Sequence, residues 1–327
     1  MWTPVAPPAD LIDFVNDGSK FLIAGHKEPD GDCIGSQLAL ASALRRYGKE
    51  VFLCSAGPFK RTEISHFKQF FMSEIPQDLI SGARCIILDC SMKERVGSIY
   101  QVLEDLPQAV IDHHARGEVY GLVRYVDADS PSSTLMVFQL IKALGLTPDA
   151  QEAEFLFFGL ATDSGFFRHI DSGAAPAVFS YASELSALGV SPKKIFGLMN
   201  GGKTLDSRLL LASVLNKAQS HFGGKLIVAT ETLEETERFG ENRDSDALYQ
   251  LLQSVDGVEA VVIIRQESAQ ACAVGLRSRD KVDVASIAAH FGGGGHKNAA
   301  GFLKEGRIHN LYPLILCEFE KIDWNSL

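Results

Sequence analysis

One histidine and two aspartates lie within seven residues near the start of the chain: His26, Asp30 and Asp32. Carboxylates so close together repel one another unless a proton or a cation lies between them. Imidazole nitrogens and carboxylate oxygens are also the ligands that hard and intermediate divalent cations prefer. The same stretch is equally compatible with a polar turn in which Asp32 caps a helix. A metal site therefore requires further ligands from elsewhere in the chain.

Further potential ligands follow structured segments at three later places. Asp89 comes directly after the apolar run 85–88, the triplet 112–114 follows the run 109–111, and Asp163 follows the helical pattern 151–162. Taken singly, the aspartates suit helix caps or turns, and the histidines suit the core. Taken together they favour one site, because ligands collect at the carboxyl ends of parallel strands. The residues of this group are Asp89, Asp112, His113, His114 and Asp163.

The elements that must position these residues are short, unbroken apolar runs, which predict strands buried on both faces. The runs are separated by segments in which apolar residues recur with helical spacing, such as 37–47 and 130–144. This alternation predicts an α/β fold with a doubly wound parallel sheet. The predicted strands are 21–24, 51–54, 85–88, 109–111 and 122–126.

A second, smaller α/β domain is predicted after a helical connector that lacks clear strands. We expect the first domain at 1–190, the connector at 191–224 and the second domain at 225–327. The second domain carries a glycine-rich loop, 292–296, whose backbone N–H groups can approach an anion because no Cβ blocks them. A flexible turn is the alternative reading of that loop. The strands and helices predicted in this domain are 226–230, 260–265 and 271–276, and 244–254 and 284–290.

The six candidate ligands comprise two imidazoles and four carboxylates, which suits two divalent cations. Mn²⁺ is favoured over Zn²⁺, because carboxylates outnumber histidines and no thiolate is offered. Asp89, at the end of a central strand, is the expected bridge between the two cations. Such a pair lowers the pKa of a shared water and holds a phosphoryl group for in-line attack. The candidate ligands are His26, Asp30, Asp32, Asp89, His113 and Asp163.

Composition restricts the partners and the compartment. The 327-residue chain has 31 basic and 41 acidic residues and a net charge of −10, which argues against a basic face for long nucleic acid. The six cysteines form no CxxC pair, which disfavours zinc fingers and disulfide frameworks. No apolar run approaches the ~20 residues of a membrane span, and the first residues do not resemble a signal peptide. A reducing cytoplasm is the expected compartment.

The motifs taken together resemble those of the DHH/DHHA1 phosphoesterase family, close to its NrnA-type branch of nanoRNA-degrading enzymes and pAp phosphatases. The resemblance covers nearly the whole chain and both predicted domains. It implies a DHH catalytic domain with a parallel sheet, followed by a DHHA1 substrate-binding domain. The segments that carry the resemblance are His26-x-x-x-Asp30-x-Asp32, Asp89, Asp112-His113-His114, Asp163 within 159–165, and 292–296 with 299–301.

The resemblance also implies a role for each candidate residue. His114 would contact the scissile phosphate or act as general acid, and Asp112 would orient a histidine ring by a hydrogen bond. One cation would be held by His26, Asp30 and Asp89, and the other by Asp32, Asp89, His113 and Asp163. The residues that would bind the remote phosphate of the substrate are Arg277, Gly293, Gly294, Gly295 and His296.

The sequence departs from the branch at two places. Ser133-Thr134-Leu135-Met136 replaces a frequent Ser-Thr-x-Glu pattern, and Ser164 stands where Thr is common, a mild change. No metal ligand is lost there, but a contact to a ligand is put in question. The family II pyrophosphatase relatives fit less well, because no Arg-Lys-Lys-Gln-like motif occurs near the C-terminus.

The expected activity is Mn²⁺-dependent hydrolysis of very short oligonucleotides, such as pApA, to 5′-mononucleotides. Dephosphorylation of 3′-phosphoadenosine 5′-phosphate is a second expected reaction. Two alternatives stay open at this point: a cyclic dinucleotide phosphodiesterase, and a nucleotide sensor without turnover. The expected partners are short oligonucleotides or small phosphorylated nucleotides and no membrane. A homodimer stays open, because the sequence does not set the oligomeric state.

Overall fold

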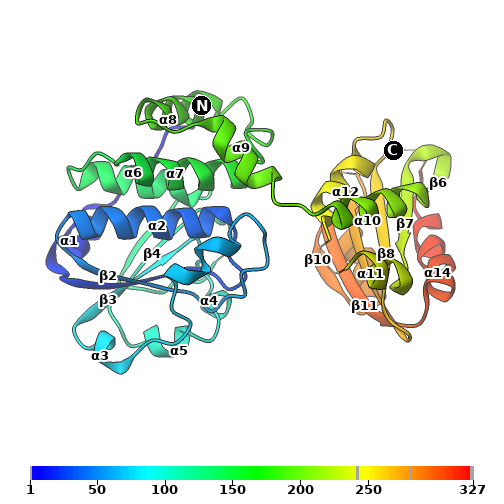
Figure 1. The fold of residues 1–327 in the computed structure, drawn as a ribbon, viewed down its shortest axis with the longest axis horizontal. Helices are drawn as coiled ribbons and strands as arrows, with labels where there is room; N and C mark the ends of the chain where they lie inside the picture. The colour runs from blue at the N-terminus through cyan, green and yellow to red at the C-terminus, as the bar shows by residue number, and fades with distance from the viewer. Residues whose placement is uncertain (1, 116, 241–242, 280, 325–327) are drawn as a thin grey trace. The chain divides into compact units, whose positions relative to one another are not determined.

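The computed structural model describes residues 2–115, 117–240, 243–279 and 281–324. The chain forms two compact units, residues 1–202 and residues 203–327, and each is built around one sheet (Figure 1). The predicted connector, 191–224, is shared between the two units. No helix among the described residues has both the length and the apolar character needed to cross a membrane.

The sheet of the first unit has five strands in the order β2-β1-β3-β4-β5, and all neighbouring strands are parallel. This arrangement confirms the predicted α/β fold with a parallel sheet. Three adjacent strands, β1, β3 and β4, end at the same edge of the sheet, so the residues that follow them meet there. The strands are β1 Lys20–Ala24, β2 Glu50–Cys54, β3 Ala83–Leu88, β4 Gln108–Asp112 and β5 Val123–Val126.

Strand β1 shows why this sheet reads as unbroken apolar runs. Phe21 and Ile23 pack into the core beneath α2, α6 and α7, while Leu22 and Ala24 pack into the core on the opposite face. Figure 1 shows helices on both faces of the sheet. Each fully buried side chain of this kind stabilises the fold by roughly 1.5–3 kcal/mol. The helices of the first unit are α1 Ala9–Asp17, α2 Gly31–Arg46, α3 Gln77–Ile80, α4 Lys93–Val96, α5 Tyr100–Leu103, α6 Ser133–Ala143, α7 Ala150–Asp163, α8 Ala175–Ala187 and α9 Pro192–Asn200.

Two helix starts differ from the sequence prediction. Helix α2 begins at Gly31 rather than at residue 37, because Asp30 is its N-cap and accepts a hydrogen bond from the Cys33 N–H at 3.1 Å. The first turns of α2 are buried all round, so no polar face marked them as helical. Helix α6 begins after Ser132, whose hydroxyl caps the Leu135 N–H, and not at Ser130.

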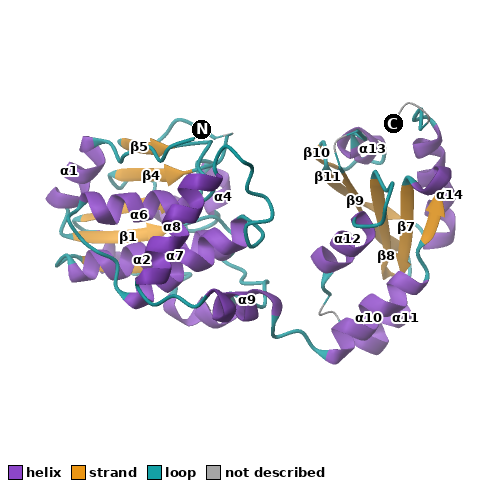
Figure 2. Cartoon of the chain, turned by 90° about the horizontal axis from the view of Figure 1, so that it is seen from above, coloured by secondary structure: helices purple, strands orange, loops and turns teal. Residues whose placement is uncertain are grey.

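The second unit has a mixed sheet in the order β10-β11-β9-β8-β7-β6, in which only β7 and β8 are parallel. One face packs against α13 and α14 and the other against α10 and α12 (Figure 2). The strands are β6 Gln219–His221, β7 Leu226–Glu231, β8 Ala260–Ser268, β9 Ala271–Ser278, β10 Gly294–His296 and β11 Ala299–Glu305. The helices are α10 Leu205–Asn216, α11 Leu233–Phe239, α12 Ser245–Gln253, α13 Val284–His290 and α14 Ile308–Glu320.

The predicted glycine-rich loop is partly wrong, because Gly294–His296 forms the edge strand β10. Its glycines are needed for packing. A Cβ on Gly293 would lie 2.3 Å from the Gly301 carbonyl oxygen, and one on Gly295 would lie 2.4 Å from the Ala299 carbonyl oxygen. A run of glycines carries no alternating pattern, so the strand could not be read from the sequence. Strand β6 likewise lies in a region predicted to lack clear strands.

Candidate metal centre

All six candidate ligands of the first unit lie at one edge of its sheet. His26 follows β1 by two residues, Asp89 comes directly after β3, and His113 comes directly after β4. Asp89 has a φ of 57°, a left-handed conformation that is uncommon for residues other than glycine and is found at functional sites. The other three ligands come from helices: Asp30 and Asp32 from the start of α2, and Asp163 from the end of α7.

Close helix packing brings the helical ligands to the strand ends. A Cβ on Gly35 of α2 would lie 2.5 Å from the Phe155 carbonyl oxygen of α7. A Cβ on Gly159 of α7 would lie 2.3 Å from the Thr134 side chain of α6 and 2.9 Å from an oxygen of Asp32. These two glycines therefore let the three helices converge on the same point.

Asp89 lies at the centre of the cluster and faces two imidazoles. Its Oδ2 is 3.4 Å from His26 Nε2, and its Oδ1 is 3.5 Å from His113 Nε2. The two oxygens of one carboxylate thus point to two different ligand groups. This is the arrangement that a carboxylate shared between adjacent cations requires.

The remaining carboxylates complete the two groups. Asp30 Oδ1 is 3.8 Å from His26 Nε2. Asp163 Oδ2 is 3.5 Å and Asp32 Oδ2 is 3.8 Å from His113 Nε2. Atoms that bind one cation at ~2.1 Å lie roughly 3.0–3.5 Å apart, so both groups have nearly the spacing of a ligand shell.

The hydrogen bonds of the two imidazoles point their free nitrogens into the cluster. His26 Nδ1 donates to the Lys27 carbonyl at 2.8 Å, and His113 Nδ1 donates to the Ser130 carbonyl at 3.0 Å. A carbonyl only accepts, so the proton of each neutral ring resides on Nδ1. The Nε2 lone pair of each ring is then available to a cation.

The start of helix α6 holds Asp32 and Asp89, the two most buried of the four candidate carboxylate ligands. The backbone N–H groups of Ser133 and Thr134 donate to the two oxygens of Asp32 at 2.6 and 3.0 Å. The Ser133 hydroxyl donates to Asp89 Oδ1 at 3.0 Å. The positive end of a helix stabilises carboxylates in this way. Sequence reasoning missed this role of Ser133, because it placed the start of α6 three residues too early.

The charges of the cluster fit two divalent cations. Four buried or partly buried carboxylates and two neutral imidazoles carry four negative charges, which two divalent cations neutralise. In the protein without cations, bound protons neutralise part of this negative charge. Burial opposes a charge on His113, but Asp89, Asp32 and Asp163 outweigh it and raise its pKa to about 11. Burial and the neighbouring carboxylates raise the pKa of Asp163 to about 6.

Cys33 also lies beside His26 and Asp89 and was not predicted as a ligand. Burial raises the pKa of its thiol, and the nearby carboxylates add to this effect while His26 opposes it, which favours the protonated thiol in the absence of a cation. A protonated thiol is a poor ligand compared with the carboxylates around it. The donor set is therefore one of oxygen and nitrogen atoms.

His114 and Asp112 form a hydrogen-bonded pair beside the cluster. Asp112 Oδ1 accepts from His114 Nδ1 at 2.7 Å and from the His113 N–H at 2.9 Å. This hydrogen bond raises the pKa of His114. Asp112 is fully buried, whereas the side chain of His114 is 38% exposed. The Nε2 atom of His114 is therefore the ring nitrogen left for solvent or substrate.

An aromatic surface next to Asp163 was not predicted. Gly165, Phe166 and Phe167 have φ angles of 57°, 57° and 70°, which are rare for bulky residues. In this turn the ring centres of Phe166 and Phe196 lie 5.1 Å apart, and those of Phe167 and Phe179 lie 5.4 Å apart. The consecutive phenylalanines were visible in the sequence, but nothing in it indicated the left-handed turn.

In the second unit, the register of the sheet brings two of the predicted substrate-binding residues to one face. His296 pairs with Ala299, and Ala299 pairs with Arg277, so the three side chains lie in one row. The Arg277 guanidinium lies over the Tyr249 ring, 4.6 Å from the ring centre, which is the distance of a cation–π contact. Gly294 has open space where a Cβ would stand, so its backbone is accessible.

Family models match both units of the chain. Residues 20–160 match the DHH family, N-terminal domain, and residues 223–307 match the DHHA1 domain. The bifunctional oligoribonuclease and PAP phosphatase NrnA of Thermus thermophilus is 32% identical over 93% of this chain and 90% of that protein. The chain belongs to the DHH family. This confirms the predicted DHH/DHHA1 assignment and, with it, the prediction of a phosphoesterase.

Solved structures share the fold. An exopolyphosphatase-related protein from Bacteroides fragilis superposes with a TM-score of 0.85 at 23% identity, over 98% of both chains. RecJ of Thermus thermophilus, solved in complex with Mn²⁺, superposes with a TM-score of 0.55 at 17% identity, over 94% of this chain and 53% of that chain. A further relative, the cyclic-di-AMP phosphodiesterase GdpP of Bacillus subtilis, is 24% identical over 89% of this chain and 46% of that protein.

Proposed function

We propose that this DHH-family phosphoesterase hydrolyses short oligonucleotides to 5′-mononucleotides and removes the 3′-phosphate of 3′-phosphoadenosine 5′-phosphate. The observation that carries the proposal is Asp89, whose two oxygens face two separate imidazoles within a cluster of four carboxylates. The substrate class is supported by the NrnA relative, which matches along nearly the whole chain.

Two divalent cations fit the ligand set, with Mn²⁺ favoured. Oxygen and nitrogen ligands, a protonated Cys33 thiol and the Mn²⁺-bound RecJ neighbour support this choice. One cation is assigned to His26, Asp30 and Asp89, and the other to Asp32, Asp89, His113 and Asp163. When bound, such cations supply an activated hydroxide and withdraw charge from the phosphoryl group.

The chain's own contribution to bond cleavage is assigned to His114 and Asp112. Asp112 holds the ring by accepting from Nδ1, and this hydrogen bond raises the pKa of His114, which favours a proton on Nε2. That proton can pass to the leaving oxygen of the substrate, or the ring can donate to a phosphate oxygen. Asp112 positions this proton and does not itself contact the substrate.

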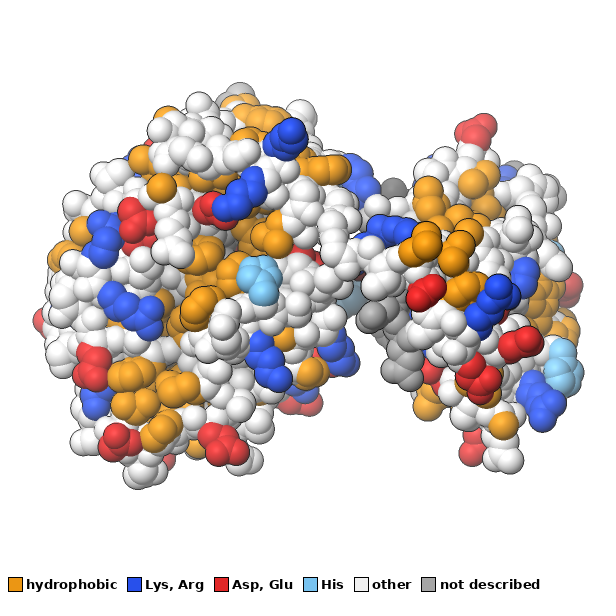
Figure 3. Space-filling model, in the orientation of Figure 1, with side chains coloured by type: hydrophobic (Ala, Val, Ile, Leu, Met, Phe, Trp, Pro, Cys, Tyr) orange, Lys and Arg blue, Asp and Glu red, His pale blue; other side chains and the backbone are white. Residues whose placement is uncertain are grey.

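The second unit is proposed to hold the remote phosphate of the substrate. Arg277 and His296 supply charge-assisted contacts, and the backbone N–H groups of Gly293, Gly294 and Gly295 supply further donors. The face shown in Figure 3 has basic and acidic side chains interspersed on each unit. With a net charge of −10, this pattern favours small substrates over long nucleic acid.

A substrate panel in Mn²⁺ tests the proposal. The panel contains pAp, pApA, di- to pentaribonucleotides and a cyclic dinucleotide. We expect turnover of pApA and the short RNAs with mononucleotide products, and a loss of about 10³-fold or more in Asp89→Asn. Unchanged turnover in that variant would refute the assigned centre. The GdpP relative favours one competing function, and hydrolysis of the cyclic dinucleotide in preference to pApA would establish it.

A further inference from the structure

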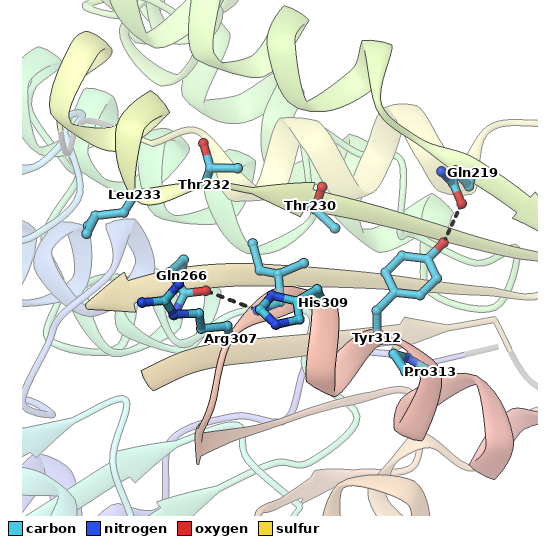
Figure 4. Close-up of a pocket in the computed structure, with 10 residues that line it drawn as sticks. Gln219, Thr230, Thr232, Leu233, Gln266, Arg307, His309, Tyr312 and Pro313 are labelled. Atoms are coloured by element: carbon cyan, nitrogen blue, oxygen red, sulfur yellow. Dashed lines mark hydrogen bonds between the residues drawn. The ribbon is translucent and has the colours of Figure 1, made fainter. Parts of the chain in front are cut away.

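A cavity of about 490 Å³ opens in the second unit, and its lining includes none of the residues assigned to the metal centre or to the remote-phosphate site. Its walls come from β6, β7, β8, the residues after β7 and the start of α14, as Figure 4 shows. Pockets that hold small molecules have volumes of roughly 300–1,000 Å³. The lining residues are Gln219, Thr230, Thr232, Leu233, Gln266, Arg307, Ile308, His309, Tyr312 and Pro313.

The cavity lies on the opposite face of the sheet from the proposed remote-phosphate site. Thr230 lies two residues after Val228 on β7, so the two side chains lie on the same face of the sheet. Val228 packs in the core under α13 and α14. Arg277 pairs with Val261, which packs in the core on the other face. Directly paired residues of antiparallel strands share a face, so Arg277 and the cavity are separated by the sheet.

The chemistry of the walls suits an anion. Among the residues that the structure describes, the lining has no carboxylate, although the chain as a whole carries a net charge of −10. Arg307 and His309 are exposed to solvent, and among the described residues their side chains make no hydrogen bond or ion pair with another residue. Arg307 is charged at any physiological pH, and its planar guanidinium matches phosphate oxygens.

The position of Arg307 in its helix also favours a bound anion. Arg307 is the N-cap of the 13-residue helix α14, and its side chain makes no capping hydrogen bond. A cation at a helix N-terminus is opposed by the helix dipole, which favours anions there. A bound anion would remove the conflict.

The rest of the cavity is largely apolar, and hydrogen bonds join several of its wall residues. The Gln266 Oε1 accepts from the Ile308 N–H at 3.0 Å, which fixes the first turn of α14. The Tyr312 hydroxyl donates to the Gln219 side chain at 2.9 Å, which fixes the ring. Figure 4 shows His309 between Arg307 and the Tyr312 ring. Tyr312 and Pro313 thus offer a flat apolar surface beyond the proposed anion position.

We propose that this cavity binds a nucleoside monophosphate, with its phosphate at Arg307 and His309 and its base against Tyr312 and Pro313. The charge of the walls selects the phosphate, and the volume and the aromatic ring accommodate the base. The assignment does not depend on hydrolysis by the first unit.

Calorimetric titration of the full chain with AMP in EDTA tests the site, since turnover and phosphate binding at the metal centre require cations. We expect AMP to bind, Arg307→Glu to weaken binding at least about tenfold, and His309→Ala to weaken it several-fold. Lys321→Ala is the matched control, because it removes a cation from the far end of α14, where Lys321 pairs with Glu318. This variant should bind AMP as the wild type does.

Arg307→Glu also separates loss of binding from loss of folding. It places a carboxylate at the helix N-terminus, so its melting temperature should equal or exceed that of the wild type. Inorganic phosphate should bind more weakly than AMP and be lost in the same variant. The proposal is overturned if the wild type does not bind AMP, if Arg307→Glu binds it undiminished, or if phosphate binds as tightly as AMP. Loss of AMP binding in Arg277→Ala would overturn it too, since the ligand would then lie on the other face.

Discussion

Replacing Ser133 with alanine isolates the hydrogen bond that the start of α6 makes to the bridging carboxylate. The Ser133 hydroxyl donates to Asp89 Oδ1 at 3.0 Å, and both side chains are buried. The backbone N–H of residue 133, which donates to Asp32, is retained in the variant. The change therefore removes one donor and leaves every proposed metal ligand in place.

The expected size of the effect follows from the charge of the acceptor. A hydrogen bond to an ionised group contributes about 1.5–3 kcal/mol. This is roughly 10- to 100-fold in an equilibrium constant. The same range is found when partners that orient metal ligands are removed in other proteins. We expect Ser133→Ala to weaken Mn²⁺ binding by this factor and to lower turnover of pApA at limiting Mn²⁺.

Calorimetric titration with Mn²⁺ measures the change, and Ser130→Ala is the matched control. The Ser130 hydroxyl is also buried, but it donates to the Ser132 carbonyl and touches no carboxylate. The Ser130 carbonyl that orients His113 is retained in that control. Equal Mn²⁺ affinities for Ser133→Ala and the wild type would refute the orienting role of this hydroxyl.

Three further predictions concern pH, the proton at His114 and the glycine strand. In EDTA, the melting temperature of the first unit should fall between about pH 7 and pH 9. The pKa of His113 is raised to about 11, so the stability from its proton is complete below the unfolded value of ~6.5 and is lost as the pH rises. The linkage of one proton over these two pH units is about 2.7 kcal/mol, which corresponds to a fall in melting temperature of roughly 5–10 °C by scanning calorimetry. Saturating Mn²⁺ should reverse the direction of this pH dependence. A melting temperature that rises with pH in EDTA would contradict a cluster filled by protons. Asp112→Asn should lower kcat for pApA by about 10²–10⁴-fold with Mn²⁺ affinity little changed, and a change in KM alone would contradict the role of His114 as proton donor. Gly294→Ala should raise KM for pApA without loss of melting temperature, because a Cβ there meets open space, whereas Gly293→Ala should destabilise the second unit; an unchanged KM in Gly294→Ala would remove the glycine strand from the substrate site.

The parallel sheet was predictable because its strands are buried on both faces. Four of its five strands contain unbroken apolar runs, as in the segment Cys85 to Leu88, whereas the edge strand β5 includes Arg124 and alternates in burial. Helix α2 was harder to delimit, because its first turns are buried among ligands and glycines rather than patterned. Strand β10 could not be predicted, since its glycines follow from the close approach of β11 and not from strand propensity.

The candidate ligands could be named from the sequence because each lies next to the end of a strand or at the start or end of a helix. What the sequence could not give is how they are held. The donors to Asp32 are backbone N–H groups of Ser133 and Thr134, and the tautomer of His113 depends on the Ser130 carbonyl. Backbone contacts of this kind cannot be predicted from the types of the residues that make them. The cavity at Arg307 was equally invisible, because its walls come from distant segments that join only in the folded second unit.

Electron paramagnetic resonance with Mn²⁺ tests most directly whether Asp89 is shared between two cations. With two equivalents of Mn²⁺ per wild-type chain, we expect the spectrum of an exchange-coupled pair, since a shared carboxylate holds the two ions adjacent. His26→Ala should retain one uncoupled ion, and Asp89→Asn should lose the coupled spectrum with a large loss of affinity. A single Mn²⁺ in the wild type, or a coupled pair that persists in Asp89→Asn, would contradict the shared carboxylate.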